Sequence, residues 1–410
     1  MKTPVEIEEM GKERIPKGFH KITLGKLVTF QRGHDLPKNS RKKGNYPVVA
    51  SNGIVDYHTE FKAKGPGVTI GRSGNIGEPL YIEKNYWPLN TTLFVKEFHN
   101  SDPKFTYYFL KTLDLNKYNS GSAVPSLNRN YIHPIEVVVP ETIEHQQKIS
   151  LYLSSLDDKI DLNNQMNSTL EQIAQTLFKR WFIDFEFPDE NGNPYKSSGG
   201  RMVDSELGEI PEGWGVKPLY DCAQYINGAA FKSADFSSNQ EGLPIIKISE
   251  LKNGVTSQTE FTKKELDKKY RITNGEILFS WSGSPDTSID IFLWAGGTGW
   301  LNQHTFRVVP YEGKEKEFIF LLLKKFKNSF IEIARNKQTT GLGHVTSRDL
   351  KNMLTAFPTK EIITRFNDIG GPIIDKIFCN SIEFNNLSQI RDSLLPKLIS
   401  GKIRVSTNSE

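Results

Sequence analysis

The stretch that decides the fold is a run of forty residues that contains neither glycine nor proline. From 144 to 183 it reads EHQQKISLYLSSLDDKIDLNNQMNSTLEQIAQTLFKRWFI. Along this run, mostly apolar residues recur at alternating intervals of four and three, from Ile149 through Leu170 to Trp181. Such intervals place the residues on one stripe of a helix. The run therefore predicts a helix about 60 Å long that needs a partner helix to cover its apolar stripe.

The expected partner is a second run near the carboxyl end of the sequence. It begins near Lys360, and its pattern resumes at Ile373 after the triplet Gly370-Gly371-Pro372. A proline inside a helix removes one hydrogen bond and clashes with the preceding turn, so we expect this helix to start late, to kink or to be broken at Pro372. Two such helices related by a pseudo-twofold axis pack antiparallel. The expected helix-pairing residues are Leu153, Leu156, Ile160, Asn163, Leu170, Leu177 and Trp181 in the first helix, and Ile377, Asn380, Leu387, Leu394 and Leu398 in the second.

Two features of these seams leave alternatives open. Asn163 and Asn380 lie at equivalent positions, and they either face each other across the twofold axis or lie at a wetter edge of the seam. In the first case they fix the register, because a buried asparagine disfavours slipped pairings. Trp181 and Phe182 at the end of the first seam form either helix-end core or a surface for a partner protein, and we favour the core.

The chain repeats itself. The segment Ile15 to Phe19, IPKGF, returns as Ile210 to Trp214, IPEGW, at an offset of 195 residues. Further along, Leu89-Asn90 matches Leu301-Asn302 at an offset of 212. A drifting offset is expected when the loops of two copies differ in length. The chain is therefore two copies of one unit of roughly 200 residues.

Each copy consists of a mixed part and a helical part. The mixed parts, 15–140 and 210–357, alternate short apolar runs with Gly, Asn and Pro turns. In the helical parts the offset settles at 217, where Leu170 to Ile173 matches Leu387 to Ile390. The fold class is thus α+β, with two pseudo-twofold-related mixed α/β domains joined by two long antiparallel coiled-coil helices. The expected boundaries are 1–141 and 210–359 for the mixed domains, 142–187 and 360–402 for the helices, 188–209 for a linker and 403–410 for a tail.

Some single elements of the mixed domains can be assigned as well. Apolar runs bounded by turn residues predict strands at Tyr46 to Ala50 and Ile277 to Trp281. Longer runs without breakers predict helices at Lys104 to Leu113 and Glu317 to Arg335.

Composition and charge narrow the possible functions. With 410 residues, 37% hydrophobic and 24% charged, the chain is ordinary globular material for two or three domains. Two cysteines and no apolar run longer than six residues predict a cytoplasmic protein without disulfides, zinc clusters, signal peptide or membrane span. The charge is uneven: 15–140 holds 17 Lys/Arg against 9 Asp/Glu (+8), 210–357 holds 19 against 16 (+3), and 141–209 holds 6 against 13 (−7). Basic mixed domains favour a polyanionic partner.

Motifs for catalysis are almost absent. The sequence has no phosphate-binding G-x-x-x-x-G-K-[ST] loop, no G-x-G-x-x-G, no H-E-x-x-H and no histidine pair at metal-ligand spacing. Pro285-Asp286 followed by Glu312-Gly313-Lys314 resembles a PD...ExK nuclease site, in which two carboxylates share Mg²⁺. Both parts lie in turn-rich segments, so we favour a coincidence and expect no catalytic residue and no metal site in this chain.

The mixed domains instead carry many loops with basic and hydrogen-bonding side chains. Arg, Asn, Gln, Lys and Ser are the residue types that contact base edges and phosphates of DNA. Any one such loop is an ordinary polar turn, but their recurrence in two related domains favours nucleic-acid binding. The candidate DNA-binding residues are Arg32, Lys42, Lys43, Ser51, Asn52, Arg72, Ser73, Asn75, Asn128 and Arg129 in the first domain, and Lys232, Lys247, Ser280, Trp281, Ser282, Lys337, Gln338 and His344 in the second.

Four segments carry a family resemblance: AQTLFKRWFIDFEFP at 174–188, LLPKLISGKIRV at 394–405, GEIPEGW at 208–214 and NQHTFRV at 302–308. With them the chain resembles, over its whole length, the specificity (S) subunit of type I restriction-modification systems. The resemblance implies two target-recognition domains, each reading one half of a bipartite double-stranded DNA sequence. It implies that the two long helices act as a spacer and as the docking surface for two methyltransferase subunits, which in turn bring restriction/translocase subunits.

The resemblance also implies that this subunit is not catalytic and binds no cofactor. S-adenosylmethionine, ATP and Mg²⁺ are then expected on the partner subunits. Two other interpretations stay open: a Mg²⁺-dependent nuclease built on Asp286, Glu312 and Lys314, and a coiled-coil scaffold with two protein-binding domains. Cleavage by the purified chain tests the first, and salt-sensitive DNA binding argues against the second.

Overall fold

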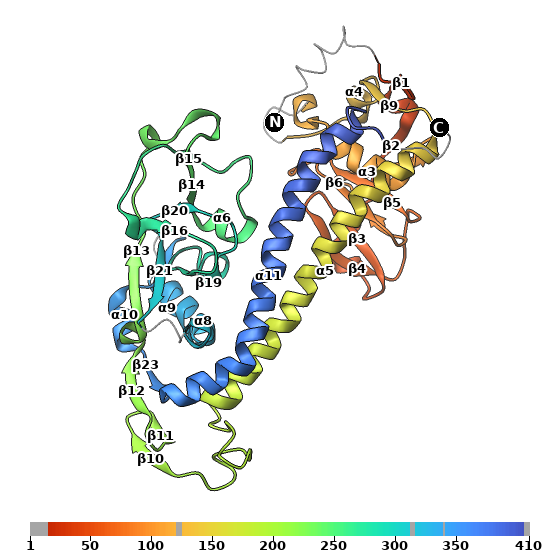
Figure 1. Ribbon diagram of the computed structural model, residues 1–410. Helices are drawn as coiled ribbons and strands as arrows, with labels where there is room; N and C mark the ends of the chain where they lie inside the picture. The colour runs from red at the N-terminus through yellow and green to blue at the C-terminus, as the bar shows by residue number, and fades with distance from the viewer. Residues whose placement is uncertain (1–14, 120–124, 312–315, 339–340, 406–410) are drawn as a thin grey trace. The chain divides into compact units, whose positions relative to one another are not determined.

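The computed structural model describes residues 15–119, 125–311, 316–338 and 341–405. Its contacts divide the chain into two units, Met1–Asp158 with Leu387–Glu410, and Lys159–Asn386. Each unit contains one mixed domain and a part of both long helices, as Figure 1 shows. The predicted α+β class, with two repeated mixed domains and two long antiparallel helices, is confirmed.

The long helices are α5 (Ile143–Phe182) and α11 (Lys360–Ile399). Of the alternatives expected at Gly370-Gly371-Pro372, a late start and a break are excluded, because α11 is one helix through the triplet; it bends in its first half (Figure 1). A proline inside a helix costs about 3 kcal/mol. Burial of Phe366 and Ile374, on either side of the triplet, offsets this cost and holds the helix together.

Polar side chains join the two long helices inside the second unit. The Nδ2 of Asn163 donates to Glu383 Oε2 at 3.0 Å, and the Nδ2 of Asn380 donates to Asn167 Oδ1 at 2.9 Å. Asn163 and Asn380 are each only 1% exposed, so they belong to the core of the pair rather than to a wetter edge. The face-to-face hypothesis expects these two asparagines to bond each other, and they do not. Each instead bonds a different residue of the facing helix.

Charged groups accompany these contacts. The hydrogen bond from Asn163 and the neighbouring Lys159, 3.2 Å away, lower the pKa of the Glu383 carboxyl. In the first unit, Arg391 of α11 binds Asp157 of α5 at 2.9 Å, and Tyr108 donates to the same carboxylate at 2.7 Å. Burial, together with that bond, raises the pKa of Tyr108. All positions of the predicted seams are buried or half-buried.

The first mixed domain is built from three small sheets. Its largest sheet is antiparallel, and a second sheet contains the parallel pair β3–β7. The strands, in sheet order, are β2 (Val28–Arg32), β8 (Thr92–Phe98), β5 (Gly67–Gly71) and β6 (Pro79–Ile82); β4 (Gly53–His58), β3 (Tyr46–Ala50) and β7 (Trp87–Pro88); and β1 (Phe19–Thr23) with β9 (Glu136–Pro140).

The second mixed domain repeats this order. The matching strands are β13 (Ala223–Asn227), β21 (Thr305–Pro310), β17 (Ile277–Ser280) and β19 (Asp290–Leu293); β15 (Phe261–Thr262), β14 (Leu243–Ile246) and β20 (Gly299–Leu301); and β12 (Gly215–Pro218) with β23 (Leu354–Phe357). A further strand, β16 (Arg271–Ile272), pairs with β20, where the first domain has the isolated bridge Ala63–Tyr86. The repeat inferred from sequence is therefore a repeat of topology. One detail differs: Leu89 N donates to Val49 O, and Asn302 N donates to Ile246 O. Leu89 thus corresponds to Asn302 at an offset of 213, not to Leu301 at 212.

The helices of the mixed domains cover these sheets. The first expected helix is α3 (Pro103–Lys111). The expected single helix from Glu317 to Arg335 is instead two, α8 (Lys316–Lys325) and α9 (Lys327–Asn336), which meet at Phe326. Between β10 (Met202–Ser205) and β11 (Gly208–Pro211) a hairpin forms where the sequence indicated mainly a linker. None of the helices in the described ranges is long and apolar enough to cross a membrane.

An aromatic cluster anchors the end of α5. Trp181 and Phe182 are both buried, with Phe366 of α11 at ring-centroid distances of 5.6 and 4.8 Å and Phe318 of α8 4.9 Å from Phe182. These side chains form the core of the second unit, which is the alternative that we favoured over a partner surface.

Candidate nucleic-acid interface

The same set of backbone contacts holds one group of loops in each mixed domain. In the first domain, Ser73 bridges Ser126; in the second, β18 (Ser282–Gly283) pairs with β22 (Gly343–His344), with Ser282 opposite His344. Arg72 and Trp281, the residues before these two serines, make the same pair of backbone hydrogen bonds. The N–H of Arg72 donates to Thr91 O and its carbonyl accepts from Leu127 N; the N–H of Trp281 donates to His304 O and its carbonyl accepts from Val345 N. We call these contacts the loop frame.

A short helix follows the loop frame in both copies. Leu127 and Val345 are fully buried and anchor the chain just before α4 (Arg129–Ile132) and α10 (Ser347–Asn352). Asn128 caps α4 by accepting from Asn130 N at 3.0 Å, and Thr346 caps α10 by accepting from Asp349 N at 3.3 Å. Asn128 was proposed as a DNA contact, and its Oδ1 is engaged in this cap.

Two glycines let the chain pass close to the frame. A Cβ on Gly33 would lie 2.2 Å from the carbonyl oxygen of Leu89, and a Cβ on Gly228 would lie 2.2 Å from that of Asn302. Contacts this short exclude any side chain. Both glycines directly follow the strand whose last residue, Arg32 or Asn227, lies beside the loops.

Several of the predicted residues of the first domain come together. Ser51, Asn52 and Asn75 line an open hollow of about 350 Å³, together with Thr69, Gly71 and Glu78. The Ser51 backbone N–H donates to Thr91 Oγ1 at 3.3 Å, which ties this turn to the loop frame. Amide and hydroxyl groups around an open hollow suit the edge of a base better than a phosphate, which cationic groups neutralise.

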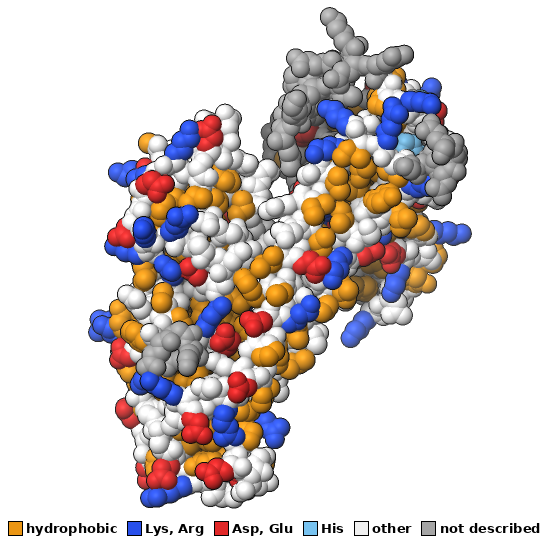
Figure 2. All heavy atoms as spheres, in the orientation of Figure 1, with side chains coloured by type: hydrophobic (Ala, Val, Ile, Leu, Met, Phe, Trp, Pro, Cys, Tyr) orange, Lys and Arg blue, Asp and Glu red, His pale blue; other side chains and the backbone are white. Residues whose placement is uncertain are grey.

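The basic residues of the first domain are mainly free surface groups. Arg32, Lys42, Lys43 and Arg129 are exposed, and Arg72 is half-buried beside Ser73. The Arg129 guanidinium lies 3.5 Å from Phe30 O. Figure 2 shows Lys and Arg side chains distributed over both mixed domains.

The second domain corrects several expectations. Ser280 is fully buried, so its side chain is not part of any DNA-facing surface; it belongs to the inner face of β17. Lys247 and Lys337 are engaged in ion pairs, with Glu260 and with Asp349 at 2.5 Å. Burial acts to raise the pKa of Asp349, but the hydrogen bonds from Lys337 and Thr346 outweigh it and lower that pKa. These two lysines therefore stabilise the fold.

The remaining predicted residues of the second domain lie on the surface. Trp281 and Ser282 are half-buried, and Lys232, Gln338 and His344 are exposed. Gln338 donates through Nε2 to Gly341 O at 2.7 Å.

Asn227 is not among the candidate residues named from the sequence, but its side chain contacts one of them, Trp281. Its Oδ1 accepts from the Trp281 indole N–H at 2.9 Å. Asn227 lies 195 residues after Arg32, which was among the candidates, so the repeat offset itself carried the signal.

The nuclease interpretation gains no support from the residues that can be placed. Asp286 forms an exposed ion pair with Arg335 at 2.5 Å, while Glu312 and Lys314 lie outside the described residues. Within the described ranges, no group of three or more His, Cys, Asp or Glu side chains is placed to hold a metal ion.

Comparison with known proteins decides the family. The model of the type I restriction modification DNA specificity domain matches twice, at residues 16–172 and 211–371. The chain belongs to this family. Each match contains one mixed domain and the beginning of the long helix that follows it, so the sequence repeat is a repeat of the specificity domain.

Similar proteins agree with this assignment. The specificity subunit of the type I restriction enzyme MjaIX from Methanocaldococcus jannaschii is 29% identical over 79% of this chain and 74% of its own length. That of the HindI enzyme from Haemophilus influenzae is 26% identical over 73% and 77%. The crystal structure of a type I restriction-modification S subunit from M. genitalium shares the fold, with a TM-score of 0.60, 15% identity and coverage of 93% of this chain and 96% of that one.

Proposed function

We propose that this chain is the DNA-recognition subunit of a type I restriction-modification complex, and that each mixed domain reads one half of a bipartite double-stranded sequence. The observation that carries the proposal is the loop frame, which recurs in two specificity domains and presents different polar side chains in each. One backbone design with two sets of side chains suits two independent half-sites.

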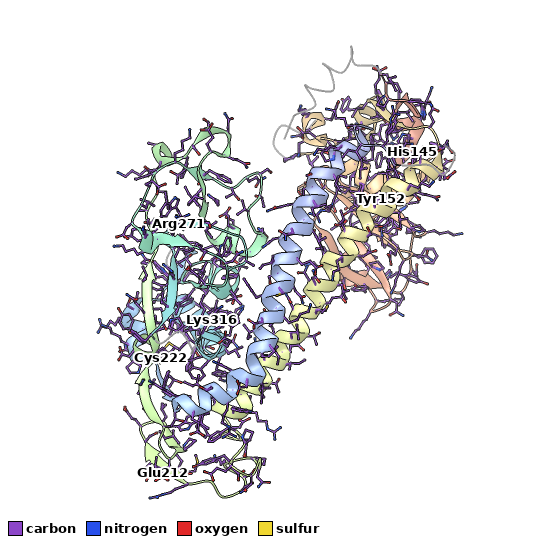
Figure 3. All side chains as sticks on the ribbon, in the orientation of Figure 1. His145, Tyr152, Glu212, Cys222, Arg271 and Lys316 are labelled. Carbon is purple, nitrogen blue, oxygen red and sulfur yellow. The ribbon has the colours of Figure 1, made fainter. Side chains whose placement is uncertain are left out.

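The partner surfaces are proposed on the long helices. Tyr152 and Ile173 of α5 are 57% and 48% exposed, and Ile369 and Ile390, 217 residues later on α11, are 49% and 47% exposed. Figure 3 labels Tyr152 on α5. Large apolar side chains exposed at matching positions of both helices favour two equivalent docking surfaces. We therefore propose that two copies of a methyltransferase subunit dock here and that restriction/translocase subunits join through them.

The catalytic chemistry is assigned to those partners. S-adenosylmethionine, ATP and Mg²⁺ are proposed to bind the methyltransferase and restriction subunits, and this chain supplies sequence recognition only. Incubating the purified chain with DNA and Mg²⁺ tests this division. The proposal expects no cleavage, and cleavage abolished by Asp286→Asn would establish the nuclease interpretation instead.

The main test is a methylation map. The chain is expressed with its cognate methyltransferase in a host without other methylation, and methylated positions are mapped across the genome. We expect two short half-sites separated by an unread spacer. Methylation at a continuous sequence, or none at all in an assembled complex, contradicts the proposal. Salt-sensitive DNA binding would argue against the alternative of a scaffold with two protein-binding domains, because phosphate contacts impose that salt dependence.

The docking surfaces have a test of their own. Tyr152→Glu and Ile369→Glu each place a charge on one proposed surface, so each single variant should bind one methyltransferase subunit and the double variant none. Native mass spectrometry counts the subunits. Leu207→Glu, in the exposed turn between β10 and β11, is the matched control and should keep two. Two bound subunits in the double variant would exclude these surfaces.

A further inference from the structure

The loop frame presents one equivalent residue in each copy. Arg72 follows β5 and Trp281 follows β17, the strands that hold the same place in their sheets. Arg72 N donates to Thr91 O at 2.8 Å, and its own carbonyl accepts from Leu127 N at 2.8 Å. Trp281 makes the same two bonds, to His304 O at 3.3 Å and from Val345 N at 2.8 Å. The backbone is therefore alike at both positions, and only the side chains differ.

A second equivalent position lies beside the first. Arg32 ends β2 and Asn227 ends β13, and each is followed by the glycine that passes close to the frame. In the second copy the two positions touch, because the Trp281 indole N–H donates to Asn227 Oδ1. One strand, β21, lies between the strands that carry them. The two positions form one pair that differs completely between the copies: two arginines in the first, asparagine and tryptophan in the second.

The arginines of the first copy are available for a ligand. The Arg72 guanidinium donates through Nη1 to Asn90 O at 3.2 Å, which fixes its direction and leaves its other N–H groups unused by any bond within the described residues. In the same described part of the chain, no carboxylate lies within ion-pair distance of Arg72 or Arg32. A fixed guanidinium fork with unneutralised charge matches the two acceptors N7 and O6 that guanine presents in the major groove.

The pair in the second copy offers different chemistry. The only N–H of the Trp281 indole is occupied by Asn227, and the ring packs 5.6 Å from Phe306 and 5.8 Å from His304. What remains is an apolar ring edge, held in place, and the Nδ2 amide of Asn227. An apolar edge contacts the thymine methyl group, and an asparagine amide pairs with adenine.

We propose that positions 72 and 281 are the equivalent base-reading positions of the two copies. Arg72, with Arg32 at the position that matches Asn227, reads a G·C pair in one half-site, and Trp281 with Asn227 reads an A·T pair in the other. This inference rests on the proposed function and deepens it: it names the base pair that each copy selects.

The test maps methylation by the complex of the full chain with its methyltransferase, for wild type, Arg72→Lys and Trp281→Ala. Lysine keeps the charge and loses the fork. We expect Arg72→Lys to reduce discrimination at one G·C pair of one half-site about 5-fold to 150-fold, with the other half-site unchanged. Trp281→Ala should relax one A·T pair of the other half-site only. Arg41→Lys, whose guanidinium is bound to Asp56 at 3.2 Å, is the matched control and should leave both half-sites unchanged.

The outcomes separate this inference from the function on which it rests. A wild-type map with no bipartite sequence removes the proposed function. A bipartite wild-type map that Arg72→Lys and Trp281→Ala both leave unchanged overturns the inference alone, as does relaxation at an A·T pair by Arg72→Lys. If Arg72→Lys fails to assemble with the methyltransferase, Arg32→Lys takes its place: relaxation at one G·C pair supports the inference, and an unchanged map overturns it.

Discussion

The two mixed domains share a backbone and differ in the side chains that it presents. Both have the same strand order in the sheet that contains β5 or β17, and both have a glycine, Gly33 or Gly228, packed against a backbone carbonyl. The residue after β5 or β17 makes the same backbone hydrogen bonds in both. At that residue one domain has Arg72 and the other Trp281, and at its neighbour one has Arg32 and the other Asn227. The two copies therefore share the backbone contacts that position these loops, while the side chains on the loops differ in chemistry.

The largest expected effect comes from the equivalent ends of the long helices. Trp181 and Leu398, 217 residues apart, are each buried in the core of their own unit. Trp181→Ala should lower the free energy of unfolding of the second unit by about 3 to 5 kcal/mol, and Leu398→Ala that of the first by about 2 to 5 kcal/mol. Hydrogen exchange measured on peptides from both units checks this. Equal loss of protection in both units from one substitution would contradict separate cores.

A smaller effect is expected at the matched glycines. Gly33→Ala and Gly228→Ala each force a methyl group against a backbone carbonyl, at Leu89 or Asn302. Overpacking of this kind costs about 1 to 3 kcal/mol. In methylation maps, each variant should weaken selection in its own half-site and leave the other intact. Gly215→Ala, where the added Cβ meets open space, controls for loss of glycine as such and should leave both half-sites unchanged.

The lysines distinguish a free cation from a paired one. Lys42 is exposed and forms no ion pair within the described residues, whereas Lys337 is bound to Asp349. Lys42→Gln should weaken binding to all DNA sequences and reduce the slope of log affinity against log salt by about 1. Lys337→Gln should lower the melting temperature and leave the slope unchanged. Fluorescence anisotropy from 50 to 200 mM salt, a range over which about six to ten phosphate contacts change affinity strongly, measures both.

The smallest effect concerns mild acid and the first unit. His133 Nε2 accepts from Phe30 N at 3.0 Å, and burial, helped by nearby Arg129, lowers the pKa of His133. The folded-state pKa is thus below the unfolded value of about 6.5. This contribution to stability is complete above the unfolded pKa and is lost as pH falls through the folded one. Between pH 7.5 and 5 the melting temperature should fall less steeply for His133→Gln than for wild type. An equal fall in both proteins would contradict this role.

Much of the fold was predictable because it is periodic. The seam of α5 follows from its intervals, and the repeat from residues such as Ile15 to Phe19 and their copies. The course of α11 at Gly370-Gly371-Pro372 was left open by the sequence, because Pro372 is locally unfavourable; burial of Phe366 and Ile374 stabilises the continuous helix. Similarly, Asn163 bonds Glu383 and Asn380 bonds Asn167, because the two helices are offset along their axes. No single sequence pattern fixes that offset.

Part of the candidate site comes together in the structure, since Ser51, Asn52 and Asn75 line one hollow. Which loop residues contact DNA stays a prediction. Ser280 was expected on the surface but is buried, because successive side chains of a strand point to opposite faces of the sheet and a shift of one residue changes the face. The ion pairs of Lys247 and Lys337 come from residues distant in sequence. Asn227 is singled out by its hydrogen bond with Trp281, which joins residues far apart in the sequence.

One measurement tests the central claim, that two independent domains on one frame each read a half-site. In a chain whose residues 210–357 are replaced by a second copy of 15–140, both halves should recognise the same short sequence. Methylation mapped with the cognate methyltransferase should then show the half-site of the first domain twice and lose that of the second entirely. Persistence of the original second half-site, or a new sequence in both halves, would contradict the account.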